Sequence, residues 1–257
     1  MEDSSDVSAI LNKLTPFPTL FKNTWLIYRS RFVIFSEIML FPFTFALIAY
    51  FVFSSGVLVS TNGFWCIFII ASLTLVSVFL QLLAYAALIY CTKDNLGLIA
   101  SLKSALRKFL PFLAVILLAS IISLIGFGLL VIPGVIVTVW LSMTAYTLIF
   151  EERKVISSLL RSRELVLGNF FPVLLRLLAA WGLLVVISIV ILLPVSLLGR
   201  IDPSNVSQSD LTALVSHVHI FDALDFSLSN LIDVFTTPFV VVFGIQIYRD
   251  LKKLKEE

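Results

Sequence analysis

The sequence predicts an all-α polytopic integral membrane protein in which six transmembrane helices form three hairpins, each preceded by a cytoplasmic amphipathic interfacial helix. The first observation is composition, because 60% of the residues are hydrophobic and 13% are charged, whereas soluble domains average roughly 45–50% apolar and about 25% charged residues. The second is a set of six long apolar segments. The third is the uneven distribution of lysine and arginine between the connections.

Each apolar segment is long enough to cross a bilayer, since a hydrocarbon core of about 30 Å needs roughly 20 apolar residues in a helix. The six segments are residues 33–53, 64–90, 109–131, 134–150, 170–198 and 231–248. The third and fourth are separated at Ile132-Pro133-Gly134, where proline lacks a backbone donor and glycine permits a turn.

Lysine and arginine gather in alternate connections between these segments. Of the 18 basic residues, Arg200 lies in a stretch that we place outside and Arg176 lies within a predicted span. The rest form four groups: Lys13, Lys22, Arg29 and Arg31; Lys93, Lys103, Arg107 and Lys108; Arg153, Lys154, Arg161 and Arg163; Arg249, Lys252, Lys253 and Lys255. Cytoplasmic loops carry the excess of positive charge, so we expect a multi-pass protein of the plasma (inner) membrane with both termini in the cytoplasm.

Residues 199–230 form the one long outer loop, which is acidic and polar and has a helix-like pattern from Leu211 to Leu228. His217, His219 and Asp222 are able to bind metal ions. His217 and His219 are two positions apart and would not face each other on a helix. We therefore expect solvated polar residues here and no bound metal.

A threefold internal repeat precedes the odd-numbered segments. The copies read LFKNTWLIYRSRFVIF from Leu20, LIASLKSALRKFLPFL from Leu98 and VISSLLRSRELVLGNFFPVL from Val155. Each is amphipathic, with Ser or Thr, basic residues and a terminal Phe, which predicts a helix lying in the headgroup plane. The third copy has four extra residues, about one helical turn, so its apolar face keeps its direction.

We treat residues 1–257 as a single membrane domain built on this repeat. Its parts are a polar N-terminal segment 1–15, repeats 16–92, 93–150 and 151–250, the long outer loop 199–230 within the third repeat, and a cytoplasmic tail 251–257.

Several short motifs resemble a family of prokaryotic membrane proteins. They are Pro133-Gly134 at the start of a segment, Glu151-Glu152, Ser158-Leu159-x-x-Ser162-x-x-Leu165-x-x-Gly168-Asn169-Phe170, and Tyr248-Arg249-Asp250-Leu251-Lys252. Over most of the chain, these residues resemble the YciC-like proteins and the membrane domain of glycerophosphoryl diester phosphodiesterases. The resemblance implies a six-helix membrane module. In the phosphodiesterase members a catalytic domain follows that module, and we expect this chain, which ends at Glu257, to lack the hydrolase activity.

Two ionisable residues are clear cases of a charge well inside a predicted span. Glu37 is about six residues into the first span and Arg176 about six residues into the fifth, so both lie about 9 Å deep on the cytoplasmic side. We expect Glu37 and Arg176 to form an intramembrane charged pair that fixes the packing of repeats one and three. Two alternatives are an Arg176 that extends to the headgroups and a polar lining for a cavity that binds a lipid headgroup or an anion.

The basic residues of the repeats are the candidate contacts to lipid headgroups. They are Lys22, Arg29, Arg31, Lys103, Arg107, Lys108, Arg161 and Arg163. Each basic residue near an anionic membrane surface contributes about 1 kcal/mol of attraction. We therefore expect a non-catalytic module that organises or senses lipid at the cytoplasmic leaflet, with anionic membrane lipids and a further copy of the chain as partners and no nucleic acid.

The alternative is a transporter or channel for a small or lipid-like solute, with a cavity near Glu37 and Arg176. The sequence contains no Walker loop, no G-x-S-x-G and no H-E-x-x-H motif. We expect neither an enzyme nor a cofactor.

Overall fold

The structure is a computed structural model that describes residues 14–54, 63–198 and 211–256. Among the described residues six helices are long and apolar enough to cross a membrane: Phe32–Ser54, Phe64–Asp94, Phe109–Leu129, Val131–Phe150, Phe170–Pro194 and Ala223–Glu256. The predicted all-α fold with six apolar spans is confirmed, and the chain is a polytopic membrane protein.

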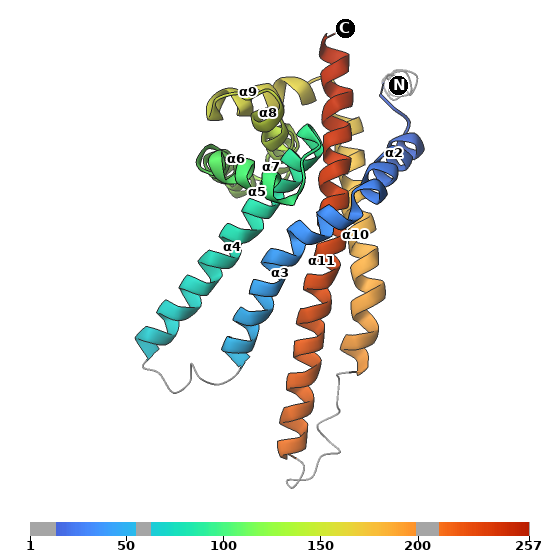
Figure 1. Cartoon of the computed structure of the whole chain (residues 1–257). Helices are drawn as coiled ribbons and strands as arrows, with labels where there is room; N and C mark the ends of the chain where they lie inside the picture. The colour runs from blue at the N-terminus through green and yellow to red at the C-terminus, as the bar shows by residue number, and fades with distance from the viewer. Residues whose placement is uncertain (1–13, 55–62, 199–210, 257) are drawn as a thin grey trace. The chain divides into compact units, whose positions relative to one another are not determined.

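Figure 1 labels the helices in chain order. Their bounds are α2 Phe17–Ser30, α3 Phe32–Ser54, α4 Gly63–Asp94, α5 Leu98–Arg107, α6 Phe109–Leu129, α7 Val131–Leu141, α8 Thr144–Phe150, α9 Val155–Val166, α10 Phe170–Leu198 and α11 Leu211–Glu256. We call α2, α5 and α9 the pre-span helices, because each directly precedes an odd-numbered span.

The fourth span differs from its predicted form, because it begins at Val131 and consists of two helices, α7 and α8. Pro133 lies in the first turn of α7, where backbone N–H groups have no partner within the helix and proline is tolerated. Leu130 alone separates α6 from α7 and has an extended backbone. Gly126 allows the two helices to approach, since a Cβ added there would lie 3.1 Å from the Cα of Gly134.

The sixth span is also longer than predicted. The expected helical pattern at Leu211–Leu228 and the span at 231–248 belong to one helix, α11. Polar side chains between them bond to earlier carbonyls of the same helix, as Ser227 does to Ala223 at 2.6 Å and Asn230 to Phe226 at 2.8 Å. Polar residues that are satisfied in this way do not end a helix. The side chains of the metal candidates His217, His219 and Asp222 lie outside the described residues.

The chain forms two compact units. The first comprises residues 14–38, 82–180 and 238–256, and the second lies within residues 39–81 and 181–237. Each of α3, α4, α10 and α11 contributes one part to the first unit and the remainder to the second, so neither unit corresponds to one predicted repeat.

The first unit contains all three pre-span helices and a dense apolar core. Figure 1 shows α5 to α9 grouped beside the C-terminal part of α11, and α9 packs against α6, α7 and α8. At the contact between α8 and α11, a Cβ on Gly244 would overlap with the Tyr146 hydroxyl. Side chains that are fully buried in this unit include Phe35, Leu88, Phe112, Met143, Leu165, Phe243 and Tyr248.

Each pre-span helix buries a small hydroxyl side chain that bonds to the carbonyl four residues earlier. Thr24 donates to the Leu20 carbonyl at 2.9 Å, Ser101 to the Gly97 carbonyl at 2.9 Å and Ser158 to the Lys154 carbonyl at 3.0 Å. All three residues are fully buried. Each of these side chains is small, and its hydroxyl already has a hydrogen-bond partner in its own helix. Each pre-span helix can therefore pack closely on the core through this face.

The connections α4–α5 and α8–α9 also share a backbone feature. Asn95 and Glu152 both have a positive φ, 59° and 51°, and each lies three residues before the next pre-span helix. A left-handed residue after a helix commonly ends it. The chain therefore turns in the same way from a returning span into the second and the third pre-span helix.

Candidate functional site

The pre-span helix α2 has one buried face and one exposed apolar face. Leu20, Thr24 and Tyr28 are buried. Large apolar side chains on its other sides remain exposed: Phe17, Phe21, Trp25 and Leu26. Large exposed apolar side chains close together indicate contact with a partner or with the membrane.

The other two pre-span helices have the same arrangement. In α5, Ser101 and Ala105 are buried while Ile99 and Leu106 are 80% and 58% exposed. In α9, Ser158, Leu159, Ser162, Leu165 and Val166 form the buried face. Ile156 and Leu160 are 68% and 55% exposed. The apolar residues of α9 thus divide between the protein core and the surface.

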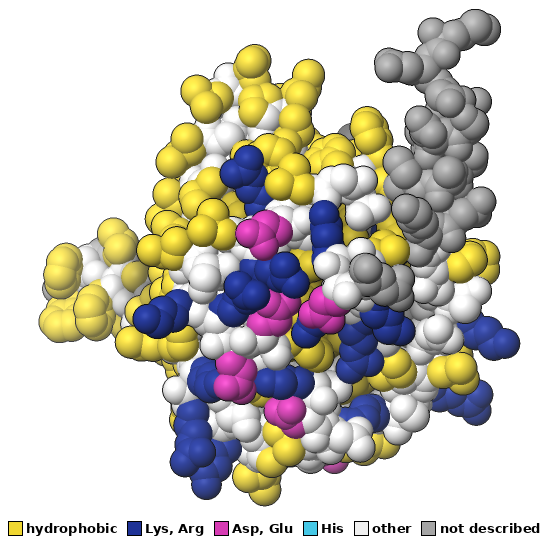
Figure 2. Space-filling view, turned by 90° about the horizontal axis from the view of Figure 1, so that it is seen from above, with side chains coloured by type: hydrophobic (Ala, Val, Ile, Leu, Met, Phe, Trp, Pro, Cys, Tyr) yellow, Lys and Arg dark blue, Asp and Glu magenta, His cyan; other side chains and the backbone are white. Residues whose placement is uncertain are grey.

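Four of the eight predicted headgroup contacts lie on the surface of the protein. Lys22 and Arg29 lie on α2, and Lys103 and Arg107 lie on α5. All four are exposed, and none has a hydrogen bond or ion pair with another residue in the described part of the chain. Figure 2 shows lysine and arginine side chains gathered on one face of the molecule, with apolar side chains among them.

The other four predicted headgroup contacts have partners within the protein. Arg31 donates to the Cys91 carbonyl at 2.8 Å, and Lys108 lies 3.3 Å from the Glu152 carboxylate. Arg163 lies over the Trp140 ring, 4.9 Å from its centroid. Arg161 pairs with Glu151 and Glu164, both at 3.4 Å. These cations contribute to the protein's own packing.

Basic side chains also cap the ends of the second and fourth spans. The carbonyl that Arg31 contacts is in the last turn of α4. Lys93, at the end of α4, donates to the Ile149 carbonyl at the end of α8, at 2.8 Å. Carbonyls at a helix C-terminus carry partial negative charge and lack helical partners, so a cation there is stabilising.

Glu152 forms ion pairs with two lysines just after the end of α8. Nζ of Lys93 and Nζ of Lys108 both lie 3.3 Å from its Oε1. Their hydrogen bonds and charges hold the pKa of the Glu152 carboxyl below its usual value. The pre-span helix α5 and the fourth span are thereby connected through one carboxylate.

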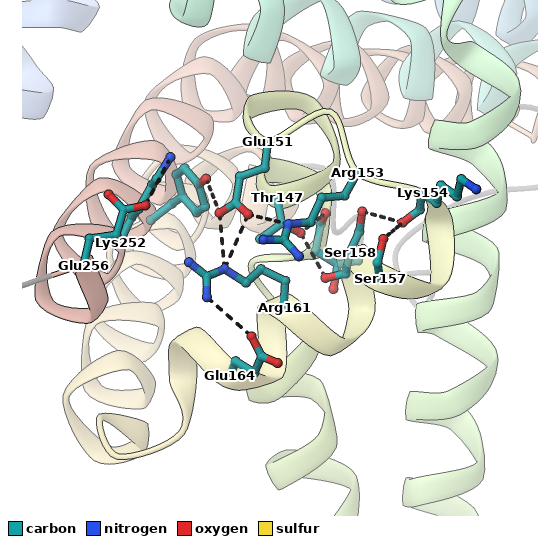
Figure 3. Close-up of polar contacts among 12 residues, drawn as sticks. Thr147, Glu151, Arg153, Lys154, Ser157, Ser158, Arg161, Glu164, Lys252 and Glu256 are labelled. Carbon is teal, nitrogen blue, oxygen red and sulfur yellow. Dashed lines mark hydrogen bonds and ion pairs between the residues drawn. The ribbon is translucent and has the colours of Figure 1, made fainter.

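Glu151 is the centre of a second polar cluster, which Figure 3 shows with Arg153 and Arg161 directed toward its carboxylate. Arg153 donates at 2.6 Å and Tyr248 at 2.9 Å, and the Glu151 side chain is only 9% exposed. Burial alone would raise the pKa of the Glu151 carboxyl, but hydrogen bonds from Tyr248 and Arg153 and the charges of Arg161 and Arg153 lower it overall. Glu151 therefore joins α8, α9 and α11 as an ionised carboxylate.

Ser162 bridges the break between α7 and α8. Its hydroxyl donates to the Trp140 carbonyl at 2.6 Å and accepts from the Met143 backbone N–H at 3.1 Å. The break separates these two backbone groups from regular helical partners, and Ser162 itself is fully buried. One turn away, the Thr147 hydroxyl donates to the Ser158 carbonyl at 3.0 Å. The serines of α9 thus fasten this pre-span helix to the fourth span.

Arg176 does not have the predicted partner. It is 5% exposed, lies 3.7 Å from the Asp250 carboxylate of α11 and donates to the Thr15 carbonyl at 2.5 Å. Glu37 is exposed and forms no ion pair among the described residues. The expected Glu37–Arg176 pair is therefore replaced by an Arg176–Asp250 pair, because the two residues share a depth but Glu37 points away from the core.

The fold and these contacts define a polytopic membrane protein with three basic, partly apolar helices in one compact unit. Comparison with protein-family models, curated proteins and solved structures finds no match to this chain. The resemblance to YciC-like proteins stays a prediction.

Proposed function

We propose that this protein is a non-catalytic membrane module that binds anionic lipid at the cytoplasmic leaflet of the plasma membrane through its pre-span helices. The observation that carries the proposal is the combination, on α2 and α5, of exposed large apolar residues with basic residues that have no partner among the described residues. Aromatic and aliphatic side chains enter the boundary between headgroups and acyl chains, while lysine and arginine contact lipid phosphates.

The division of the basic residues supports this function. Arg31, Lys108, Arg161 and Arg163 are engaged by the protein, so they supply less free charge than their number suggests. We assign the anionic headgroups to Lys22, Arg29, Lys103 and Arg107, because none of them has a hydrogen bond or ion pair within residues 14–54, 63–198 and 211–256. At about 1 kcal/mol for each residue, the two cations of α2 contribute about 2 kcal/mol, or roughly a 30-fold preference for an anionic lipid.

Trp25 is a natural reporter for this preference, because it is 48% exposed on the same helix as Lys22 and Arg29. The three other tryptophans are replaced by phenylalanine, and the full-length chain is reconstituted in vesicles. Either phosphatidylglycerol or phosphatidylcholine carries brominated acyl chains that quench nearby tryptophan. We expect stronger quenching of Trp25 by brominated phosphatidylglycerol.

The variant Lys22→Gln/Arg29→Gln should lose most of this excess quenching. Lys253→Gln/Lys255→Gln is the matched control, because it removes the same charge from exposed residues at the end of α11 and should keep the excess. Equal quenching by the two lipids in the parent protein, or an equal loss in both variants, would refute lipid selection by α2.

A further inference from the structure

The second unit contains a cavity of about 390 Å³ between α3, α4 and α11. Its lining consists mostly of alanine, aliphatic and aromatic side chains: Ala46, Ala49, Tyr50, Phe53, Ile70, Leu73, Thr74, Ser77, Phe226 and Asn230. Tyr50 and Phe226 form one wall as a stacked pair with ring centroids 4.4 Å apart. Small residues on α3 leave the space open where these helices would otherwise touch.

Two of the four polar residues of the lining bond to carbonyls of their own helices. The Thr74 hydroxyl donates to the Ile70 carbonyl at 2.8 Å, and the Asn230 amide donates to the Phe226 carbonyl at 2.8 Å. A buried water needs two to four polar partners, so a cavity lined in this way does not suit a water cluster. The walls favour a hydrocarbon ligand.

Volume and depth further restrict the ligand. An apolar cavity of about 150 Å³ holds a six-carbon benzene ring, and the larger space here therefore suits a chain of roughly 15 carbons. The α3 lining residues lie between Ala46 and Phe53, in the part of that helix that ends at Ser54. The α4 lining residues begin at Ile70, seven residues or about 10 Å of helix after Gly63. The cavity therefore lies in the parts of α3 and α4 nearest the 54–63 connection, below the helix ends and among acyl chains.

Two lining residues, Phe53 and Thr74, are exposed at the surface of the unit. Phe53 borders the cavity and is 60% exposed, which provides a lateral opening from the bilayer. We infer that this cavity is a binding site for the hydrocarbon chain of a membrane lipid. The chain would enter from the side and pack between Ala49 and the Tyr50–Phe226 pair.

Photo-crosslinking tests the site in the full-length protein reconstituted in vesicles. One arm uses phosphatidylcholine with a diazirine near the end of an acyl chain, and the other uses a free fatty acid with the same group. Mass spectrometry then locates the adducts. We expect adducts concentrated at Tyr50 and Phe226, and the arm that gives them identifies the lipid source.

Two substitutions to phenylalanine separate the cavity from the lipid-facing surface. Ala49→Phe fills the cavity and should reduce these adducts at least fivefold, whereas Ala71→Phe, at an exposed position of α4 outside the lining, should leave them unchanged. If Ala49→Phe does not fold, Ala46→Leu takes its place. Unchanged labelling in the filled variant, equal losses in both variants, or no concentration of adducts at Tyr50 and Phe226 would overturn the inference.

Discussion

Replacing Ser162 by alanine removes one hydroxyl that serves two backbone groups. In the native structure this hydroxyl donates to Trp140 and accepts from Met143 at the break between α7 and α8. The site is fully buried, so water does not replace the lost bonds. Ser162→Ala therefore leaves a carbonyl and an N–H without partners inside the protein.

The expected cost follows from these two groups. A buried polar group without a partner costs about 1–3 kcal/mol, while hydrogen bonds between membrane helices average only about 0.6 kcal/mol because the unfolded chain in the membrane also finds partners. We expect a loss of about 2 kcal/mol, because here one hydroxyl satisfies two groups. For a chain of this size that corresponds to about 4–8 °C in melting temperature.

The assay is unfolding in mixed detergent micelles with increasing dodecyl sulfate, followed by far-ultraviolet circular dichroism and repeated as a thermal melt. Ser157→Ala is the matched control on the same helix, because its hydroxyl makes an exposed bond to the Lys154 carbonyl of its own helix at 2.9 Å. Ser157→Ala should change stability by less than about 0.5 kcal/mol. Equal stability of the two variants would refute the role that we assign to Ser162.

Three further changes test other contacts of the first unit by the same unfolding assay. Gly244→Ala should destabilise the protein, because the new methyl group overlaps with the tyrosine hydroxyl that faces it, whereas Gly182→Ala has open space and should be neutral or slightly stabilising. Arg176→Met and Asp250→Asn should each cost about 3–5 kcal/mol, and the double variant should cost less than their sum; strict additivity would contradict a direct pair. Because the pKa of Glu151 is lowered in the folded protein, its ionised form contributes stability above the ordinary pKa of 4.5, and this contribution is lost as the pH falls through the lower folded value. Glu151→Gln should remove that part of the acid sensitivity, and an unchanged profile of stability against pH would contradict it.

The spans could be predicted from sequence because the bilayer imposes one length and one polarity on every crossing helix. The residues at which the spans begin and end could not be predicted in this way. Ser227 and Asn230 are typical of turns, yet in α11 they bond to their own helix and allow it to continue. The break inside the fourth span depends on Ser162, a residue about twenty positions away, and local patterns do not contain such contacts.

Depth along the helices predicted the wrong partner for Arg176, because a pair also requires that both side chains lie on helix faces that point toward each other. Arg176 and Glu37 have similar depths, but Arg176 is buried and Glu37 is exposed. The carboxylate that Arg176 meets is Asp250, which the sequence places just beyond the sixth apolar segment. Since α11 continues to Glu256, Asp250 is still on a packed helix.

At the candidate site, the sequence also did not predict which basic residues have partners within the protein. Sequence identifies Lys22 and Arg31 as equivalent positive charges before the first span. The structure directs Arg31 to a helix carbonyl and leaves Lys22 exposed. In the sequence, Glu151-Glu152 is only part of a resemblance. Its contacts with Lys93 and Tyr248 come from segments far apart in the chain.

The most direct test of the central claim is the membrane depth of the pre-span helices, measured by electron paramagnetic resonance on spin labels in anionic vesicles. Single labels at Leu106 and Ile156, which are exposed and apolar, are compared with labels at Lys103 and Lys154, which are exposed and basic, after Cys66 and Cys91 are replaced by alanine. We predict that labels at Leu106 and Ile156 are accessible to oxygen and shielded from a water-soluble nickel complex, and that labels at Lys103 and Lys154 lie at headgroup level. Equal exposure of all four labels to the nickel complex would show that these helices lie in water, and would contradict the proposed lipid-binding module.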